Sequence, residues 1–222
     1  MPLPLPIRDV KLCYVTDRKA LAGNAEEQVR LLLEKIERAA GADVDWIQIR
    51  EKDLSGRALS ELVREAVRRV PTTCRILVND RVDVACTTGA AGVHLGEQSL
   101  PVAEVRRLLN EKQSGGEFLV GVSTHSLEAA LSAEKAGADY VIFGPIFATP
   151  SKAKFGAPQG VPRLAEVCAR IRVPVVAIGG ITLENAGECV QAGAAGVAAI
   201  RLFQGANDVA AIIRALRSPK SR

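Results

Sequence analysis

Aromatic residues and long apolar runs are both scarce in this sequence, and each shortage excludes a class of protein. Only 4% of the 222 residues are aromatic, and no basic run is interleaved with aromatic residues, so we expect no binding to nucleic acid. No apolar run reaches the ~18 residues of a membrane span, so we expect no membrane segment. Residues 1–6 are rich in proline and lack the basic segment of a signal peptide.

Patterned cysteines are also missing. The five cysteines occur singly, without a CxxC or any other metal-ligand spacing. Scattered cysteines in an odd number are typical of small buried side chains in a reducing compartment, so we expect a cytoplasmic protein. No G-x-G-x-x-G follows the first strand-like run, which disfavours an open dinucleotide-binding sheet. No Ser–His–Asp pattern or pair of carboxylates stands out.

The composition suits one globular domain that binds a small anion. The sequence is 48% hydrophobic, which at this length is enough for a single core. Its 29 Lys and Arg residues outnumber its 25 Asp and Glu residues, and the formal charge is +4. If this small excess gathers in one pocket, it suits an anionic metabolite.

A phrase of small residues recurs four times and indicates the architecture. It stands at residues 40–43, 88–91, 136–139 and 192–195, each time after a helix-like segment and before an apolar strand-like run. The glycine of each phrase predicts a left-handed end to the helix, followed by a tight turn into a strand.

Eight strand patterns alternate with eight helical patterns. The predicted strands are 11–15, 44–50, 76–79, 92–95, 118–123, 140–143, 175–179 and 196–201, and the predicted helices are 24–40, 56–70, 81–88, 101–112, 126–136, 160–171, 183–192 and 208–217. This alternation predicts an α/β fold, a single-domain (β/α)8 TIM barrel over residues 11–217, with its active site at the C-terminal ends of the strands. Residues 1–10 are expected to form an extended lead-in and residues 218–222 a frayed tail.

The segment from Trp46 to Asp53 is the most informative strand. Alternation places Gln48, Arg50 and Lys52 on one face and the two isoleucines between them on the other. A half-exposed antiparallel strand has the same pattern. In a parallel barrel both faces are covered, and the two cations then require an anion.

Polar residues follow nearly every predicted strand, whereas the opposite rim has mostly Ala/Gly turns. This asymmetry favours an enzyme. The polar residues concerned are Asp17, Arg50, Glu51, Lys52, Asn79, Asp80, Glu97, Ser99, Ser123, His125, Thr149, Ser151, Lys152 and Arg201, and Gly180 and Ile200 lie at the same ends of the strands.

Two loops suggest binding of phosphate and closure over a substrate. Gly179 to Thr182 open the predicted helix after strand 7, where free N–H groups bind phosphate, although a plain turn capped by Thr182 is also compatible. The loop from Gly144 to about Gly160 is long, as lids and binding loops are. A disordered insertion is the alternative, and the apolar residues of this loop argue against it.

Three single residues have both a chemical and a structural interpretation. Asp80 is suited to Mg²⁺ or to an ion pair with Arg81 or Lys52. His94 lies inside strand 4, where we expect a hydrogen-bonded core histidine. His125 lies at the rim, where an acid or base role is as plausible as a structural one.

Together these motifs resemble the thiamine phosphate synthase family over nearly the whole chain. The segments that carry the resemblance are Gln48-Ile49-Arg50-Glu51-Lys52, Asn79-Asp80, His94-Leu95-Gly96-Glu97, Gly121-Val122-Ser123-Thr124-His125, Gly144 through Lys152, and Ile178 through Thr182. The resemblance implies that hydroxymethylpyrimidine diphosphate loses diphosphate and that the nitrogen of hydroxyethylthiazole phosphate captures the pyrimidine carbocation.

The resemblance also implies roles for individual residues. It places the pyrimidine diphosphate on Gln48, Arg50, Lys52, Asn79, Ser123 and Lys152. It places the thiazole phosphate on Thr149, Ser151, Gly180, Ile200 and Arg201. Mg²⁺ is implied at Asp80, the partners are small phosphorylated substrates, and the oligomeric state stays open, a homodimer included.

One departure from the family leaves alternatives open. Ser99 stands where the family has its second metal-binding Asp, and Glu97 is a possible substitute. The loop around Ser99 resembles the sister group of thiazole tautomerases, for which His125 is the plausible acid and base. Gln48 and the full set of cations favour the synthase. A non-catalytic regulator that binds thiamine precursors is the third alternative.

Overall fold

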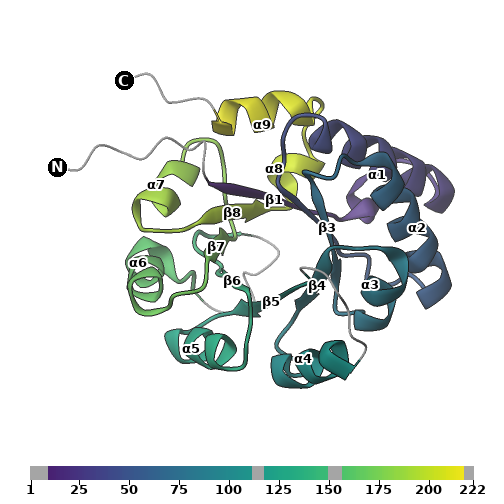
Figure 1. The fold of residues 1–222 in the computed structure, drawn as a ribbon. Coiled ribbons are helices and arrows are strands. Elements are labelled where there is room, and N and C mark those ends of the chain that lie inside the picture. Colours follow the sequence, from purple (N-terminus) through teal and green to yellow (C-terminus); the bar gives the residue numbers. More distant parts are fainter. Residues whose placement is uncertain (1–9, 112–117, 150–156, 218–222) are drawn as a thin grey trace.

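A computed structural model describes residues 10–111, 118–149 and 157–217 of the chain. Eight parallel strands form a closed barrel in the order of the sequence, β1 to β8 (Figure 1). The strands are β1 Lys11–Val15, β2 Trp46–Ile49, β3 Arg75–Asn79, β4 Gly92–Leu95, β5 Leu119–Thr124, β6 Tyr140–Phe143, β7 Val175–Ile178 and β8 Gly196–Ala199. The predicted TIM barrel is therefore confirmed.

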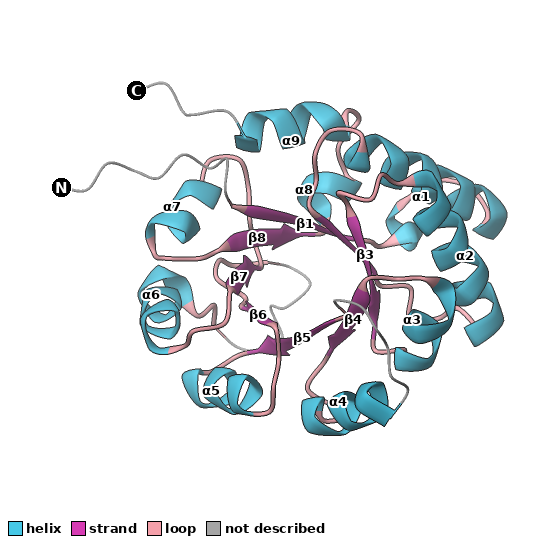
Figure 2. Cartoon of the chain, in the orientation of Figure 1, coloured by secondary structure: helices cyan, strands magenta, loops and turns pink. Residues whose placement is uncertain are grey.

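Helices form a ring around the strands (Figure 2). They are η2 Arg18–Ala20, α1 Ala25–Ala40, α2 Gly56–Arg69, α3 Val82–Thr88, α4 Val102–Glu111, α5 Leu127–Lys135, α6 Gly160–Arg170, α7 Ala186–Gln191, α8 Arg201–Gln204 and α9 Val209–Arg217. The expected lead-in and tail fall almost wholly outside the described residues. No helix in the described ranges is both long enough and apolar enough to cross a membrane.

Alternation along the strands separates two apolar layers. One set of side chains fills the barrel interior, and it consists of Cys13, Val15, Trp46, Leu77, Tyr140, Ile142, Val176 and Ala198. The neighbouring strand residues, such as Ile47 and Val78, belong to the larger cluster between barrel and helices. Because a parallel barrel is covered on both faces, the strands are buried almost throughout.

Strand β2 shows the predicted alternation but ends earlier than expected. Trp46 lies in the interior cluster, and Gln48, two residues on, is also buried. All four strand residues are buried, so the half-exposed antiparallel alternative is wrong. The strand ends at Ile49, and Arg50 therefore lies in the loop that follows rather than in the strand.

The Ala/Gly phrases end their helices as predicted in three cases out of four. Gly89, Gly137 and Gly193 have φ angles of 77°, 91° and 97°, the left-handed conformation that glycine adopts without strain. Gly41 is right-handed, with φ of −68°, and Asp43 takes the left-handed position instead, with φ of 67°. The prediction for Gly41 was therefore wrong.

Two helices near the C-terminal ends of the strands differ from the predictions. The predicted strand 196–201 ends at Ala199, and the short helix α8 follows at once. Helix α7 begins at Ala186 rather than Leu183. The hydroxyl of Thr182 accepts from the amides of Glu184 and Asn185 at 3.3 and 3.4 Å, so it stabilises a separate turn before the helix. The predicted helix N-terminus at Gly179 to Thr182 was wrong.

The barrel interior predicts an asymmetry between two glycine substitutions. A Cβ atom on Gly121 would lie 1.9 Å from Cζ of the buried Tyr140, whereas one on Gly187 would have no neighbour within 4 Å. We expect Gly121→Ala to lower the free energy of unfolding by about 1–3 kcal/mol, the usual cost of overpacking. Gly187→Ala, in helix α7, should leave it unchanged or raise it by up to about 1 kcal/mol. Urea unfolding of both variants measures this, and equal stabilities would contradict the packing described here.

Candidate active site

Three side chains at the ends of β2 and β3 form a directed chain of hydrogen bonds. Nε2 of Gln48 donates to Oδ1 of Asn79 at 2.9 Å, and Nδ2 of Asn79 donates to Oδ2 of Asp80 at 2.6 Å. The side-chain amide of Asn79 thus accepts with its oxygen and donates with its nitrogen, which fixes its orientation. The structure brings these three predicted site residues together.

Asp80 is the centre of the polar contacts at this end of the barrel. Its backbone is left-handed, with φ of 61°, and its carboxylate accepts from the Gly96 amide at 3.1 Å and from the Ser99 hydroxyl. Nζ of Lys52 lies 3.6 Å from Oδ2. Partial burial raises the pKa of Asp80, but the hydrogen bonds from Ser99 and Gly96 and the charge of Lys52 outweigh burial, and the net shift is downward. Asp80 is therefore ionised at neutral pH.

Of the two partners predicted for Asp80, the structure selects Lys52. Arg81 instead holds the exposed Asp83, with its Nε 2.8 Å and its Nη2 2.5 Å from the two carboxylate oxygens.

His94 is a buried core histidine, as predicted. Its Nδ1 lies 3.1 Å from the Tyr140 hydroxyl and its Nε2 lies 2.9 Å from the Ser123 hydroxyl. A neutral imidazole has one N–H, so one hydroxyl donates to the ring and the other accepts from it. Burial lowers the pKa of His94 to about 4, with a smaller opposite effect of Asp80, so the ring is neutral at pH 7. His94 thereby fixes the position of Ser123.

His125 connects three loops at the rim. Its Nδ1 contacts the carbonyl oxygen of Gly144, at the start of loop 6, which runs from Gly144 to Gly160. Its Nε2 lies 3.7 Å from the carboxylate of Glu97, in the loop after β4. The carboxylate that was considered as a substitute metal ligand therefore lies beside His125.

Arg50 presents a cation without an acidic partner. The residue is half-buried, and within the described ranges its guanidinium forms no hydrogen bond or ion pair. Its backbone amide donates to the hydroxyl of Thr16 at 3.0 Å. A partly buried cation that lacks a carboxylate is suited to bind an anion.

Loops 6, 7 and 8 meet at the ends of β7 and β8. Gly180 has φ of 66°, and a Cβ atom there would lie 2.7 Å from the carbonyl oxygen of Ala148, so only glycine permits this approach. Nη2 of Arg201 donates to the hydroxyl of Thr149 at 2.8 Å. Within the described chain the backbone amides of Gly180 and Arg201 donate to no protein group. These amides are therefore available to an anion.

Part of loop 6 lies outside the described residues, and Ser151 and Lys152 belong to that part. The described ends of the loop are held together. Gln159 donates its amide to Pro145 at 2.7 Å, and Gly160 donates to Ile146 at 3.1 Å. The loop is thus anchored at its base beside Gly144, which is the residue that His125 contacts.

The donor set is compatible with one magnesium ion that also has phosphate ligands. Among the described residues no group of three or more His, Cys, Asp or Glu side chains could hold a metal. Mg²⁺ typically binds one or two carboxylates and completes its shell with phosphate oxygens and water. Asp80, ionised and at the rim, meets the minimum of that requirement, and Ser99 adds no charge.

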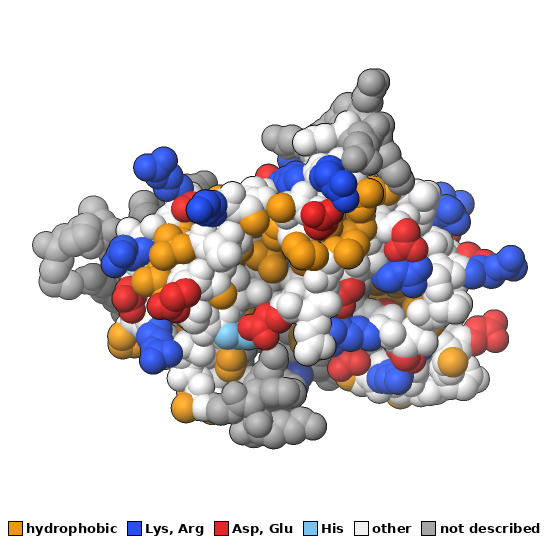
Figure 3. Space-filling view, turned by 90° about the horizontal axis from the view of Figure 1, so that it is seen from below, with side chains coloured by type: hydrophobic (Ala, Val, Ile, Leu, Met, Phe, Trp, Pro, Cys, Tyr) orange, Lys and Arg blue, Asp and Glu red, His pale blue; other side chains and the backbone are white. Residues whose placement is uncertain are grey.

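Two surface hollows lie between helices, outside the ring of strands, and Asp80 is part of the lining of the second. One of about 390 Å³ lies between α2 and α3, and one of about 400 Å³ lies between α3 and α4. The second is mostly apolar and includes Leu100 and Leu108, two of the exposed large hydrophobic residues. Apolar and charged side chains are interspersed on the face in Figure 3. Neither hollow contains Arg50, Asn79 or Ser123, so we locate the candidate active site at the ends of the strands.

Sequence reasoning missed several supporting residues. Tyr140 was read only as part of a strand, yet it holds His94. Thr16 and Arg18 were given no role, yet both contact the buried carboxylate of Glu51. A Thr directly after the first predicted strand and an acid between two cations after the second were the available signals.

Comparisons with known proteins agree on one family. The family model described as thiamine monophosphate synthase matches residues 12–203. A putative thiamine-phosphate synthase of Geobacter sulfurreducens is 45% identical over 194 residues, covering 86% of this chain and 85% of its own. A thiamine-phosphate synthase of Chloroflexus aurantiacus is 40% identical, covering 96% of this chain and 93% of its own. The solved structure of a thiamine phosphate pyrophosphorylase from Pyrococcus furiosus has a TM-score of 0.80 and 31% identity, with 95% of each chain covered.

The lowered pKa of His94 predicts a loss of stability in mild acid. The unfolded chain binds a proton on this residue below pH 6.5, whereas the folded protein binds it only below about 4. The contribution of His94 to the free energy of unfolding is therefore fully present above pH 6.5, the pKa in the unfolded chain. It falls by up to roughly 3 kcal/mol as the pH drops to the pKa of the folded protein. Urea unfolding between pH 7 and 4 should show a shallower loss for His94→Gln than for the wild type. Both proteins have the same Asp and Glu residues, so these affect both equally. Identical slopes of stability against pH for His94→Gln and the wild type would contradict a neutral, buried His94.

Proposed function

The chain belongs to the thiamine monophosphate synthase family, and we propose how its active site divides between the two substrates. The synthase activity expected from the sequence is confirmed at the level of the family and its named relatives, and nothing in the comparisons favours the tautomerase or the regulator. The site residues, the bound metal, the homodimer and the cytoplasmic location stay predictions.

The pyrimidine diphosphate is proposed to bind over β2, β3 and β5. Arg50 and Lys52 supply the positive charge, and the ordered amides of Gln48 and Asn79 supply directional hydrogen bonds. The Ser123 hydroxyl, held by neutral His94, supplies another. Lys152 is expected to contribute from loop 6, but it lies outside the described residues. The observation that carries this proposal is the guanidinium of Arg50, which has no hydrogen-bond or ion-pair partner among the described residues and is near enough to His94 to lower its pKa.

The thiazole phosphate is proposed to bind where loops 6, 7 and 8 meet. The amides of Gly180 and Arg201 are available as donors, and Ile200 is the residue that leads from β8 into α8. The Arg201 side chain and the Thr149 hydroxyl, already in contact, close the other side. Ser151 belongs to the same expected set and lies outside the described part of the chain. β7 and β8 are neighbours in the barrel, so these groups can reach one phosphate.

The two subsites support a dissociative substitution. The bond between the pyrimidine methylene carbon and the diphosphate oxygen breaks, and its electron pair leaves with diphosphate. The thiazole nitrogen then donates its lone pair to the carbocation, giving thiamine phosphate. Arg50 and Lys52 take up the charge that develops on the leaving group. The family is Mg²⁺-dependent in general, and Mg²⁺ on Asp80 would add Lewis acidity toward the diphosphate oxygens.

Removal of the Arg50 cation should slow turnover strongly. We expect Arg50→Ala to lower kcat/KM for the pyrimidine diphosphate by about 10²-fold or more, the scale of one lost electrostatic stabiliser. The control is Arg107→Ala, which removes a cation paired with Glu104 on the exposed surface of α4. Steady-state assays of both variants measure the effect, and a rate within a few-fold of wild type for Arg50→Ala would contradict the proposed site.

Introduction of the missing carboxylate should strengthen metal binding. Ser99→Asp should lower the Mg²⁺ concentration for half-maximal rate by roughly tenfold, about 1.4 kcal/mol, because a second carboxylate would face the metal beside Asp80. The product should remain thiamine phosphate. Ser99→Ala, which removes the hydrogen bond to Asp80 without adding charge, is the control and should lower that concentration by much less than Ser99→Asp does. Activity that is independent of metal in the wild type would refute the assignment of Asp80.

A further inference from the structure

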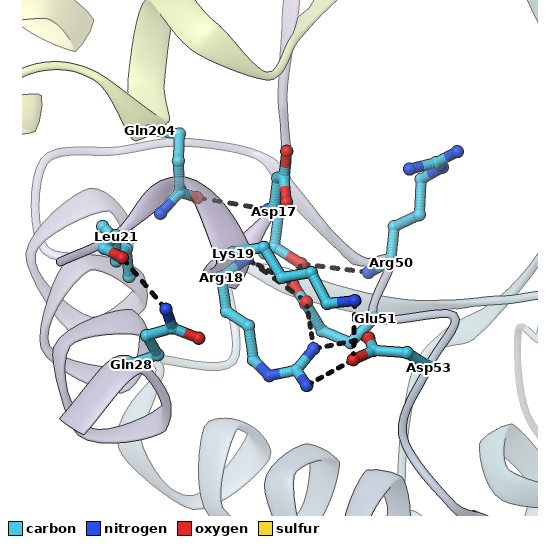
Figure 4. A network of polar contacts seen from close by, with 10 residues as sticks. Asp17, Arg18, Lys19, Leu21, Gln28, Arg50, Glu51, Asp53 and Gln204 are labelled. Carbon is cyan, nitrogen blue, oxygen red and sulfur yellow. Dashed lines mark hydrogen bonds and ion pairs between the residues drawn. The ribbon is translucent and has the colours of Figure 1, made fainter. Parts of the chain in front are cut away.

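Glu51 points away from the active site although it lies between two of its cations in the sequence. The residue is only 4% exposed, and its carboxylate is turned toward the segment after β1, where Arg18 is 6% exposed. Figure 4 shows Arg50 extending away from the network that holds Glu51. Glu51 is thus bound by Arg18 rather than by either of its neighbours in the sequence, Arg50 and Lys52.

Thr16 links this buried carboxylate to the backbone of Arg50. It is completely buried, and its hydroxyl donates to Oε1 of Glu51 at 2.6 Å. A hydroxyl has one proton, so with that proton given to Glu51 it can only accept from its second partner. That partner is the amide of Arg50, at 3.0 Å. The amide of Thr16 in turn donates to the carbonyl oxygen of Gln48 at 3.0 Å.

The network neutralises Glu51 without using the cations of the active site. The backbone amide of Arg18 lies 3.1 and 3.2 Å from the two carboxylate oxygens of Glu51, and its Nη1 lies 3.1 Å from Oε2. Arg18 also binds Asp53 through two bonds of 2.7 Å, and Nζ of Lys19 lies 3.1 Å from the same carboxylate. The carboxylates of Glu51 and Asp53 are therefore bound by Arg18 and Lys19, and in the part of the chain that the structure describes Arg50 has no acidic partner.

We infer that Thr16 and Glu51 are positioning residues for the diphosphate site. They fix the backbone at Arg50 immediately after β2 ends, where no further strand pairing holds the chain. They also keep the acidic side chain that follows Arg50 in the sequence away from the leaving group. This inference rests on the proposed role of Arg50. It goes beyond that role because neither residue touches substrate.

The test is the removal of a single hydroxyl. Thr16→Val keeps the shape of the side chain and breaks both of its hydrogen bonds. It should lower kcat/KM for the pyrimidine diphosphate about tenfold, equivalent to about 1.4 kcal/mol. It should weaken binding of inorganic diphosphate, measured by calorimetry with Mg²⁺ present, by a similar factor. The KM for the thiazole phosphate should not change. Thr16→Ser, which retains the hydroxyl, should behave as wild type to within about twofold.

A double-mutant cycle separates positioning from general stability. In an Arg50→Ala background, Thr16→Val should have less than a twofold further effect, because the side chain that it positions is absent. Equal effects in both backgrounds would overturn the inference, as would wild-type kinetics and diphosphate binding for Thr16→Val alone. If Thr16→Val does not fold, Glu51→Gln serves in the same cycle, since it retains an oxygen for Thr16 and loses the charge.

The same experiments distinguish failure of the inference from failure of the proposed function. A damaging Arg50→Ala with a silent Thr16→Val overturns the positioning role alone. A silent Arg50→Ala overturns the proposed diphosphate site, and the positioning role with it.

Discussion

Burial on both faces of each strand is the constraint on which the active site depends. In a closed parallel barrel, a polar side chain that points inward has little access to bulk water and is stabilised by a hydrogen-bond partner inside. Gln48, Asn79, His94 and Ser123 all meet this requirement with hydrogen bonds to one another or to Tyr140 and Asp80. Beneath them the interior is apolar, with Trp46 and Tyr140 in contact at a ring-centroid distance of 4.7 Å. The polar groups are therefore held in place before any substrate binds.

The distribution of charge follows from the same constraint. A carboxylate near the leaving group would oppose a diphosphate, so acids at this end of the barrel must be neutralised or turned away. Glu51 is turned away and neutralised by Arg18, and Asp80 is surrounded by donors. Arg50 alone among these charged residues has no opposite charge in contact within the described part of the chain. The formal charge of the chain is only +4, so it is local arrangement, more than net charge, that prepares the anion site.

Local patterns predicted the elements well and their ends less well. The period of two in Trp46 to Ile49 and the polar strand ends were readable because they depend on neighbouring residues alone. The start of α7 was misjudged because the turn contacts of Thr182 compete with helix formation. The end of β8 was misjudged because a short helix, α8, begins at Arg201. Gly41 failed as a left-handed cap because Asp43 took that role. The contacts of Arg18 with Glu51 and of Tyr140 with His94 span 33 and 46 residues, and no local pattern reports them.

Position 99 shows how one residue changes the order in which a site is assembled. Two carboxylates at positions 80 and 99 would repel each other and would require a cation between them even in the free protein. Ser99 instead donates its hydroxyl to Asp80, which also receives bonds from Gly96 and Asn79 and lies near Lys52. The Asp80 carboxylate is thus satisfied without metal, and an entering Mg²⁺ must displace some of these donors. Phosphate oxygens that arrive with the ion supply the ligands that the protein does not, which favours metal and diphosphate entering together.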